Sequence, residues 1–101
     1  LAEMLGRTVL AEGDDTKTIK TLAWCTGGGQ GFIEQAVAAG VDAFITGEVS
    51  EQTIHTSREM GISFFAAGHH ATERYGVKAL GEHIQSEFNL DVTFIDIPNP
   101  A

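Results

Sequence analysis

The sequence predicts an α/β fold, with a mostly parallel sheet and helices on both faces. Short apolar runs that read as strands alternate with segments of helical period, and the runs at 41–46 and 62–67 lack a clean polar–apolar alternation. Alternating strands and helices imply right-handed crossovers and parallel pairing. Strands without alternation are typical of a sheet covered on both sides. At 101 residues we expect a single α/β domain over 1–101.

Glycines and caps divide the chain into elements. Gly6, Gly40 and Gly61 stand where a left-handed residue commonly ends a helix, and Ser50 is a residue type that caps helix starts. The first two strands are close together and joined by a turn, so we expect an antiparallel edge strand there; we expect Trp24 in the core. The predicted order is a helix end at 1–6, strands at 8–12 and 18–25, a helix at 32–40, a strand at 41–46, a helix at 50–60, a strand at 62–67, a long helix from 69 to about 88, and a last strand at 91–97.

Composition limits the classes of partner and location. The chain has 14 Asp and Glu against 6 Lys and Arg, a net charge of −8 with scattered basic residues, so nucleic-acid binding is disfavoured. No apolar run approaches the roughly 20 residues that span a bilayer, and no signal-peptide pattern is present. We therefore expect no membrane partner and a cytoplasmic location. Cys25 is the single cysteine, which excludes an internal disulfide; with no base identified for it, a small buried residue is favoured over a nucleophile.

The first residues indicate a longer protein. The chain starts at Leu1 without an initiator Met, and residues 1–7 read as the last turns of a helix that begins upstream. We therefore expect a carboxyl-terminal fragment of a larger chain.

The chemistry-bearing residues cluster where predicted strands end. Three strands run into a glycine, at Gly27, Gly47 and Gly68. Parallel strands end at one edge of the sheet, which is where open α/β sheets bind ligands. That edge would gather Glu48, His69 and Glu73 beside the glycine-rich loop at 26–31.

His69 and Glu73 lie one helical turn apart and so share a face, where both can bind one divalent ion. Spacing alone does not identify a site, because two other pairs share it: His55 with Glu59, and His83 with Glu87. For those pairs the simpler interpretation is a solvated helix face. For His69 and Glu73 the alternative is that His69 caps the helix and Glu73 favours the positive end of its dipole. One His and one Glu are too few for a tight site, since catalytic zinc usually has three protein ligands.

The loop after the strand at 18–25 offers a second kind of contact. Gly27, Gly28, Gly29 and Gln30 follow a strand and open a helix, so their amide groups could cradle the anionic part of a substrate. The loop lacks the Lys-Ser/Thr ending of a P-loop and does not complete the dinucleotide fingerprint. A tight turn beside the crevice is the alternative.

The ordered series Gly27-Gly28-Gly29, Thr46-Gly47-Glu48 and Gly68-His69-His70-Ala71-Thr72-Glu73 resembles the carboxyl-terminal part of the NIF-three-like proteins, the YbgI type described as GTP cyclohydrolase type II homologues. The likeness runs from about residue 18 to 101. The resemblance implies a two-lobed α/β protein with a dinuclear metal centre between its halves, assembled as a hexamer. It places two family ligands on His69 and Glu73 and leaves the others to an amino-terminal half. It also implies that Glu48 and His55 are pocket positions with catalytic roles.

The leading interpretation is a metal-dependent hydrolase whose dinuclear site is half supplied here. Divalent ions would lower the pKa of a bound water and polarise the bond under attack, and mixed imidazole and carboxylate ligation does not distinguish Zn, Mn, Fe, Co or Ni. Glu48 would orient a ligand or accept a proton. The substrate, a small molecule such as a nucleotide or phosphoester, is not identified. The alternative is a non-catalytic metal- or anion-binding module for oligomer assembly or partner docking.

Overall fold

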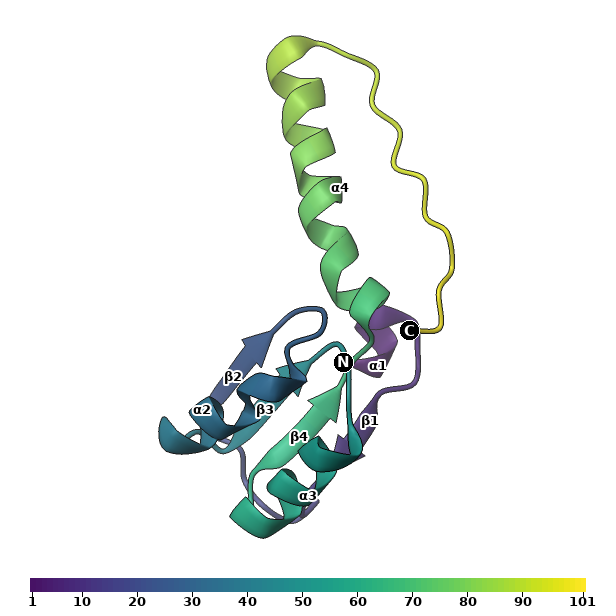
Figure 1. Cartoon of the computed structure of the whole chain (residues 1–101). Helices are drawn as coiled ribbons and strands as arrows, with labels where there is room; N and C mark the ends of the chain where they lie inside the picture. Colours follow the sequence, from purple (N-terminus) through teal and green to yellow (C-terminus); the bar gives the residue numbers. More distant parts are fainter.

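The computed structural model describes residues 1–101 and has a four-stranded mixed sheet at its centre (Figure 1). In chain order its elements are α1 (Ala2–Leu5), β1 (Leu10–Glu12), β2 (Leu22–Cys25), the 3-10 turn η1 (Gln30–Phe32), α2 (Ile33–Ala38), β3 (Ala43–Thr46), α3 (Glu51–Met60), β4 (Ser63–Ala66) and α4 (His69–Phe88). The strand order is β1-β4-β3-β2, with β2, β3 and β4 parallel and β1 antiparallel to β4 at one edge. The mostly parallel sheet is confirmed, and β1 is an antiparallel edge strand. The first two strands do not lie together, however: β1 pairs with β4, and β2 pairs with β3 at the other edge, because the turn between β1 and β2 leads to a crossover instead of a hairpin.

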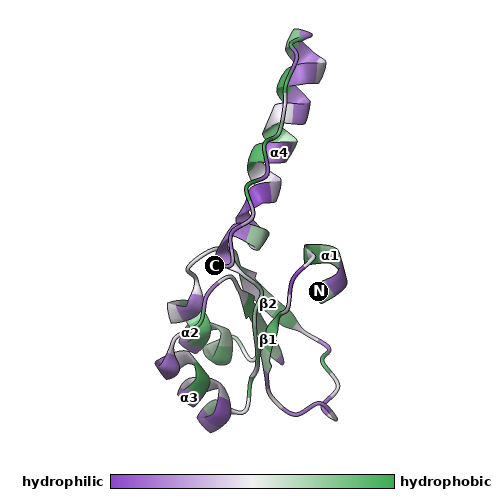
Figure 2. Cartoon of the chain, turned by 90° about the vertical axis from the view of Figure 1, so that its right-hand side faces the viewer, coloured by the Kyte–Doolittle hydropathy of each residue, from purple (hydrophilic) through white to green (hydrophobic).

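The core lies between the sheet and the two short helices α2 and α3, which cover the same face (Figure 2). Register places Phe44 of β3 beside Phe64 of β4, with ring centroids 6.2 Å apart. Both rings are buried and pack with Ile33 and Ala36 of α2. Burying each phenyl ring contributes about 1.5–3 kcal/mol, so this layer helps to hold β3 and β4 against α2.

Local signals set the bounds of α3 as the sequence predicts. Ser50 and Thr53 form a capping box at its start, and Gly61 ends it in the left-handed conformation, with φ 68°. The cap fixes the turn between β3 and α3, which is the turn that carries Glu48.

The second face of the sheet has little cover, so the expectation of helices on both faces holds for one face only. Only the four-residue α1 lies on this side (Figure 2). Trp24 is 72% exposed and Leu22 46% exposed, so the prediction that Trp24 is a core residue is wrong. The reason is the direction of α4, which starts at the sheet edge and projects away from the sheet instead of folding back over it (Figure 1).

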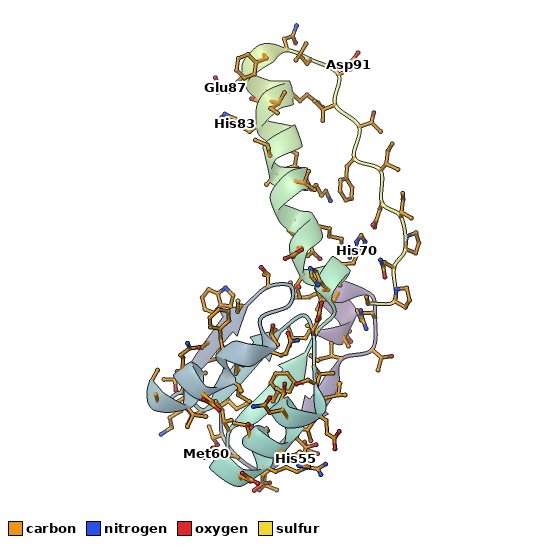
Figure 3. The ribbon with its side chains drawn as sticks, in the orientation of Figure 1. His55, Met60, His70, His83, Glu87 and Asp91 are labelled. Carbon is orange, nitrogen blue, oxygen red and sulfur yellow. The ribbon has the colours of Figure 1, made fainter.

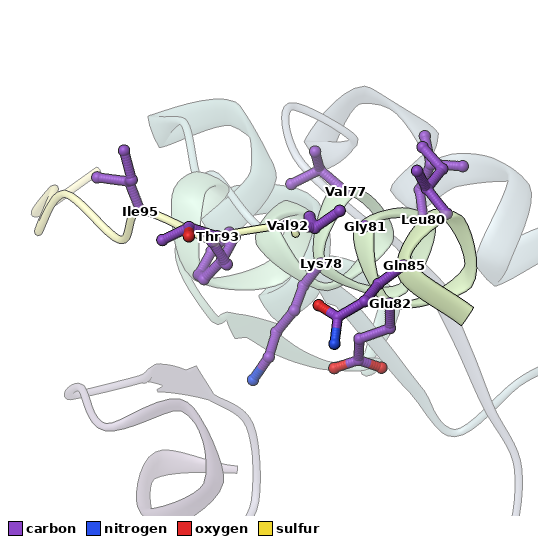
Figure 4. Close-up of a pocket in the computed structure, with 11 residues that line it drawn as sticks. Val77, Lys78, Leu80, Gly81, Glu82, Gln85, Val92, Thr93 and Ile95 are labelled. Carbon is purple, nitrogen blue, oxygen red and sulfur yellow. The ribbon is translucent and has the colours of Figure 1, made fainter. Parts of the chain in front are cut away.

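The predicted strand at 91–97 is also wrong: this segment is an extended tail without a ladder partner. It runs back alongside α4, and a helix has no free backbone groups to pair with a strand. Between them α4 and the tail enclose a groove of about 550 Å³, lined by Val77, Leu80, Val92 and Ile95 among others (Figure 4). No helix, the 20-residue α4 included, combines the length and apolar character needed to cross a membrane.

Candidate functional site

The glycine-ended strands meet at one edge, as parallel topology requires. Cys25, at the end of β2, lies opposite Thr46 at the end of β3, which lies opposite Ala66 in β4. Beyond them the backbones stay in contact, because Gly47 N donates to Gly27 O at 2.9 Å and Gly68 N donates to Gly47 O at 2.9 Å. Three loops from separate parts of the chain therefore pack as one surface.

On this surface the imidazole of His69 lies between two carboxylates. Its Nδ1 is 2.5 Å from Glu48 Oε1, and its Nε2 is 2.9 Å from Glu73 Oε2. The side chains of His69, Glu48 and Glu73 are 39%, 43% and 51% exposed, so the cluster is open to solvent on one side. His69 does not cap α4: the N-cap position is Gly68, which has no side chain to do so.

The cluster favours positive charge between its carboxylates. The hydrogen bond with Glu48, aided by the charge of Glu73, raises the pKa of His69 above its ordinary value. The same hydrogen bond from His69 lowers the pKa of Glu48. The two carboxylates flank one ring, and each ring nitrogen faces a carboxylate oxygen.

The glycine-rich loop forms a wall of the cluster, and its first glycine is required there. Gly27 has φ +67°, and a Cβ at this position would overlap Glu73 Oε1 and lie 3.1 Å from His69 Nε2. At Gly29 a Cβ would lie 2.6 Å from Cys25 Sγ. These positions are glycine because the backbone approaches its neighbours too closely for any side chain.

Two amides of this loop are already hydrogen-bonded. Gly27 N donates to Thr72 Oγ1 at 3.2 Å, and Gly29 N donates to Thr46 Oγ1 at 3.1 Å. These contacts favour the tight-turn interpretation over an anion cradle built from successive free amides. Substrate contact by Gly28 and the rest of the loop stays a prediction.

Gln30, the last of the predicted loop residues, reaches the cluster from η1. Its Nε2 donates to Glu48 Oε2 at 3.4 Å, while its Oε1 is buried without a hydrogen-bond partner. A buried acceptor without a hydrogen-bond partner costs free energy.

The structure does not bring His55 to this cluster. The side chain is exposed on α3. Its Nε2 lies 3.5 Å from Oε1 of Glu51, which is one helical turn earlier, so the ion-pair partner of His55 is Glu51 and not Glu59. In Figure 3 His55 lies at the lower end of the body, near Met60, whereas His70 marks the base of α4. His83 and Glu87 lie at the far end of α4 (Figure 3), and both are exposed.

Sequence reasoning missed a junction next to the cluster. Asp96 of the tail contacts His70 Nε2 at 3.0 Å and accepts a hydrogen bond from Arg74 Nη1 at 2.9 Å. Arg7 Nη1 and His70 N both donate to Ala101 O, at 3.0 and 3.3 Å. The available signal was Asp96 itself, an acidic residue between two isoleucines, and its partners lie more than 20 positions away.

The cluster fits part of a metal centre. A divalent ion bound by imidazole and carboxylate at about 2.1 Å from each holds the two donor atoms roughly 3 Å apart, and His69 Nε2 and Glu73 Oε2 are 2.9 Å apart. Glu48 on the other nitrogen matches the carboxylate that commonly orients a metal-bound histidine. No group of three or more His, Cys, Asp or Glu residues is arranged to hold an ion by itself. Further ligands would have to come from outside these residues.

Fold and site together define a class: a mixed-sheet α/β domain that gathers imidazole and carboxylate side chains at the carboxyl ends of its parallel strands. The chain belongs to the Duf34/NIF3 (NGG1p interacting factor 3) family, whose model matches residues 1–100.

Relatives of known sequence are similar but much longer. The chain is 67% identical to a GTP cyclohydrolase 1 type 2 homolog of Yersinia pestis, covering 100% of this chain and 41% of the relative. It is 62% identical to the protein of the same description in Pseudomonas aeruginosa, covering 98% and 39%. The chain therefore spans about two-fifths of the length of these relatives.

Solved structures show the same fold. Protein ybgI, described as of unknown function, superposes with a TM-score of 0.93 and 62% identity over 99% of this chain and 41% of that one. TTHA1606 from Thermus thermophilus superposes with a TM-score of 0.89 and 30% identity over 99% and 40%. Both matches extend across the projecting α4 and the tail.

Proposed function

We propose that this domain supplies part of a divalent metal centre in a metal-dependent hydrolase. The observation that carries the proposal is the His69 imidazole held between Glu48 and Glu73 at the strand edge. This arrangement concentrates negative charge around an imidazole nitrogen that can act as a ligand when neutral, which is an environment that suits a divalent cation.

Each residue has a distinct role in the proposal. His69 Nε2 and Glu73 bind the ion, and Glu48 holds His69 Nδ1 so that the ring keeps its orientation. The alternative role for Glu48, whose side chain is partly exposed, is to accept a proton. A bound divalent ion would supply Lewis acidity and lower the pKa of a nearby water. The reaction is proposed as hydrolysis of a nucleotide or phosphoester.

The remaining ligands and partners are proposed to lie in the rest of the protein. An amino-terminal half would complete a site of two ions drawn from Zn, Mn, Fe, Co or Ni, and six copies would assemble. Two features support further ligands from the rest of the protein: the relatives are more than twice as long as this chain, and only two donors converge on the proposed ion position. The relatives' description, GTP cyclohydrolase 1 type 2 homolog, supports a nucleotide as the first substrate to try.

Metal analysis of the full-length protein tests the proposal. The His69→Ala/Glu73→Ala variant is expected to lose most of its bound metal, measured by elemental analysis after desalting. The matched control is His83→Ala/Glu87→Ala, which has the same spacing on the same helix but lies at the far end of α4. Wild-type metal content in the first variant would show that the assignment is wrong.

A titration tests the sharing of the site. The isolated 101-residue chain is expected to bind divalent metal far more weakly than the whole protein, because two donors hold an ion less tightly than three or four. Equal affinities would contradict a site shared with another part of the protein.

The alternative, a non-catalytic module for assembly or docking, is favoured by one observation. Leu80 and Phe88 on α4 and Ile95 and Ile97 on the tail are more than half exposed, as is Trp24 on the sheet, and such apolar surface is typical of protein interfaces. Turnover separates the two functions. Full-length protein loaded with each metal would be screened against phosphoesters, cyclic nucleotides and GTP, and a metal-loaded hexamer without activity would favour the module.

A further inference from the structure

The hydroxyl of Thr72 joins the glycine-rich loop to the base of α4. Thr72 Oγ1 donates to Gly68 O at 2.8 Å, which is an ordinary contact of a threonine with the preceding turn of its own helix. It also accepts a hydrogen bond from Gly27 N at 3.2 Å, across 45 positions of sequence. This second contact is not part of helix geometry and ties two separate segments together.

The position of the loop decides how much room Glu73 has. The α-carbon of Gly27 lies so close to this carboxylate that a methyl group added there would overlap Oε1. If the loop moved toward Glu73 it would displace the carboxylate, and if it moved away the carboxylate would lose the wall that limits its rotamers. The loop therefore controls the side chain that follows Thr72 in the sequence.

A second threonine secures the other side of the same loop. Thr46 is 1% exposed, donates to Gly27 O at 3.2 Å and accepts from Gly29 N at 3.1 Å. Thr46 belongs to the sheet, whereas Thr72 belongs to the helix that carries His69 and Glu73. Of the two, only Thr72 links the loop to the proposed ligands.

We propose that Thr72 is a positioning residue of the metal site. Its hydroxyl holds Gly27 against Glu73 and thereby fixes where that carboxylate presents its oxygens to the ion. The inference rests on the proposed function of His69 and Glu73. The Thr72 hydroxyl bonds to backbone atoms and to neither of their side chains, so it acts through the loop and not as a ligand.

Paired variants of the full-length protein test this role. Thr72→Val keeps the shape and removes the hydroxyl, whereas Thr72→Ser keeps the hydroxyl. Titration of the metal-free protein with Co²⁺ or Zn²⁺ is expected to give a dissociation constant about tenfold higher for Thr72→Val, at the lower end of the loss seen when a residue supporting a ligand is removed. Thr72→Ser is expected to bind like the wild type.

Ser57→Ala is the matched control for lost stability. The Ser57 hydroxyl is buried and, like that of Thr72, donates to a backbone carbonyl, here Ile62 O at 2.7 Å, but Ser57 belongs to α3 and contacts no site residue. Both Thr72→Val and Ser57→Ala are expected to lower the unfolding temperature of the metal-free protein, and only Thr72→Val is expected to weaken metal binding. Equal weakening by both variants, or none by Thr72→Val, would overturn the proposal.

Amide hydrogen exchange keeps the test decisive if Thr72→Val does not fold. In the metal-free wild type the Gly27 amide is expected to exchange slowly because Thr72 accepts its proton, and it should remain slow in Thr72→Ser. Rapid exchange of Gly27 in the wild type would overturn the role of Thr72. If His69→Ala/Glu73→Ala kept wild-type metal affinity, the proposed function itself would be wrong, whatever the exchange rate of the Gly27 amide.

Discussion

The base and the far end of α4 carry the same His-to-Glu spacing in different surroundings. At the base, His69 contacts Glu73 and also Glu48 from another loop, and the backbone of Gly27 lies against Glu73. At the far end, His83 and Glu87 are exposed, in the part of the helix that projects away from the sheet (Figure 1). Helical spacing brings two side chains together, whereas a site needs neighbours that only the sheet edge supplies.

The largest expected difference between the two regions is in stability, tested by one Phe→Ala change in each. Phe64→Ala removes a fully buried ring from beneath the site and is expected to lower the free energy of unfolding by about 3–5 kcal/mol. Phe88→Ala, at a side chain 68% exposed, is expected to cost less than about 1 kcal/mol in the 101-residue chain. Urea unfolding measures both values.

Repeating the pair in the full-length protein sharpens the comparison. If the rest of the protein packs on α4, Phe88→Ala will cost more there than in the 101-residue chain, while the cost of Phe64→Ala will stay nearly the same. An unchanged small cost for Phe88→Ala would indicate that this end of α4 stays exposed in the whole protein.

The second prediction concerns the wall of the site and uses two glycines of similar φ. Gly27→Ala and Gly61→Ala place a side chain at φ +67° and +68°, which costs roughly 1–2 kcal/mol of stability. At Gly61 the new methyl group meets nothing, whereas at Gly27 it displaces Glu73. Gly27→Ala is therefore expected to weaken metal binding of the full-length protein by about 10- to 100-fold, and Gly61→Ala to leave it unchanged. Equal metal affinities in a titration would show that the loop does not constrain Glu73.

Features with local causes were predictable from the sequence, whereas features that depend on register were not. The capping box at Ser50 and the helix end at Gly61 follow from neighbouring residues. The contact of Glu48 with His69 spans 21 positions and requires the β3–β4 register, so sequence reasoning assigned both residues to one edge without pairing them.

The wrong predictions have the same origin. The apolar alternation at 91–97 favours an extended backbone, which the structure has, but a strand also needs a partner with free backbone groups. Trp24 reads as a core residue only if a helix covers its face, and α4 projects away from it. In both cases the residue types set a local preference, for an extended backbone or for burial. The direction of α4 then determined whether a strand partner or a covering helix was present.

The third prediction separates the two carboxylates that contact histidines. Glu48→Gln keeps the size of the side chain and removes the charge beside His69 Nδ1, so metal affinity of the full-length protein is expected to fall by about tenfold. Glu51→Gln makes the same change beside His55, 3.5 Å away on an exposed helix face, and is expected to have no effect. Isothermal titration with Zn²⁺ measures both. An effect of Glu51→Gln as large as that of Glu48→Gln would mean that general surface charge, and not the orientation of His69, sets the affinity.

The smallest expected effect comes from a carboxylate just before the amino end of β3, at the opposite end of the parallel strands from the site. Asp42 accepts hydrogen bonds from Lys20 N, Thr21 N and Thr21 Oγ1 at 2.9, 3.0 and 3.1 Å, and these contacts lower its pKa. Because the unfolded chain then binds more protons than the folded one, Asp42 contributes stability above about pH 4 that is lost as the pH falls through its lowered pKa. Asp42→Asn is expected to lower the unfolding temperature slightly at pH 7 and to flatten its decline below about pH 4, with no change in metal affinity. If Asp42→Asn lowered the metal affinity as much as Glu48→Gln, the two ends of the parallel strands would be coupled. Carboxylates at the site and carboxylates that only stabilise the fold could then not be distinguished by this test.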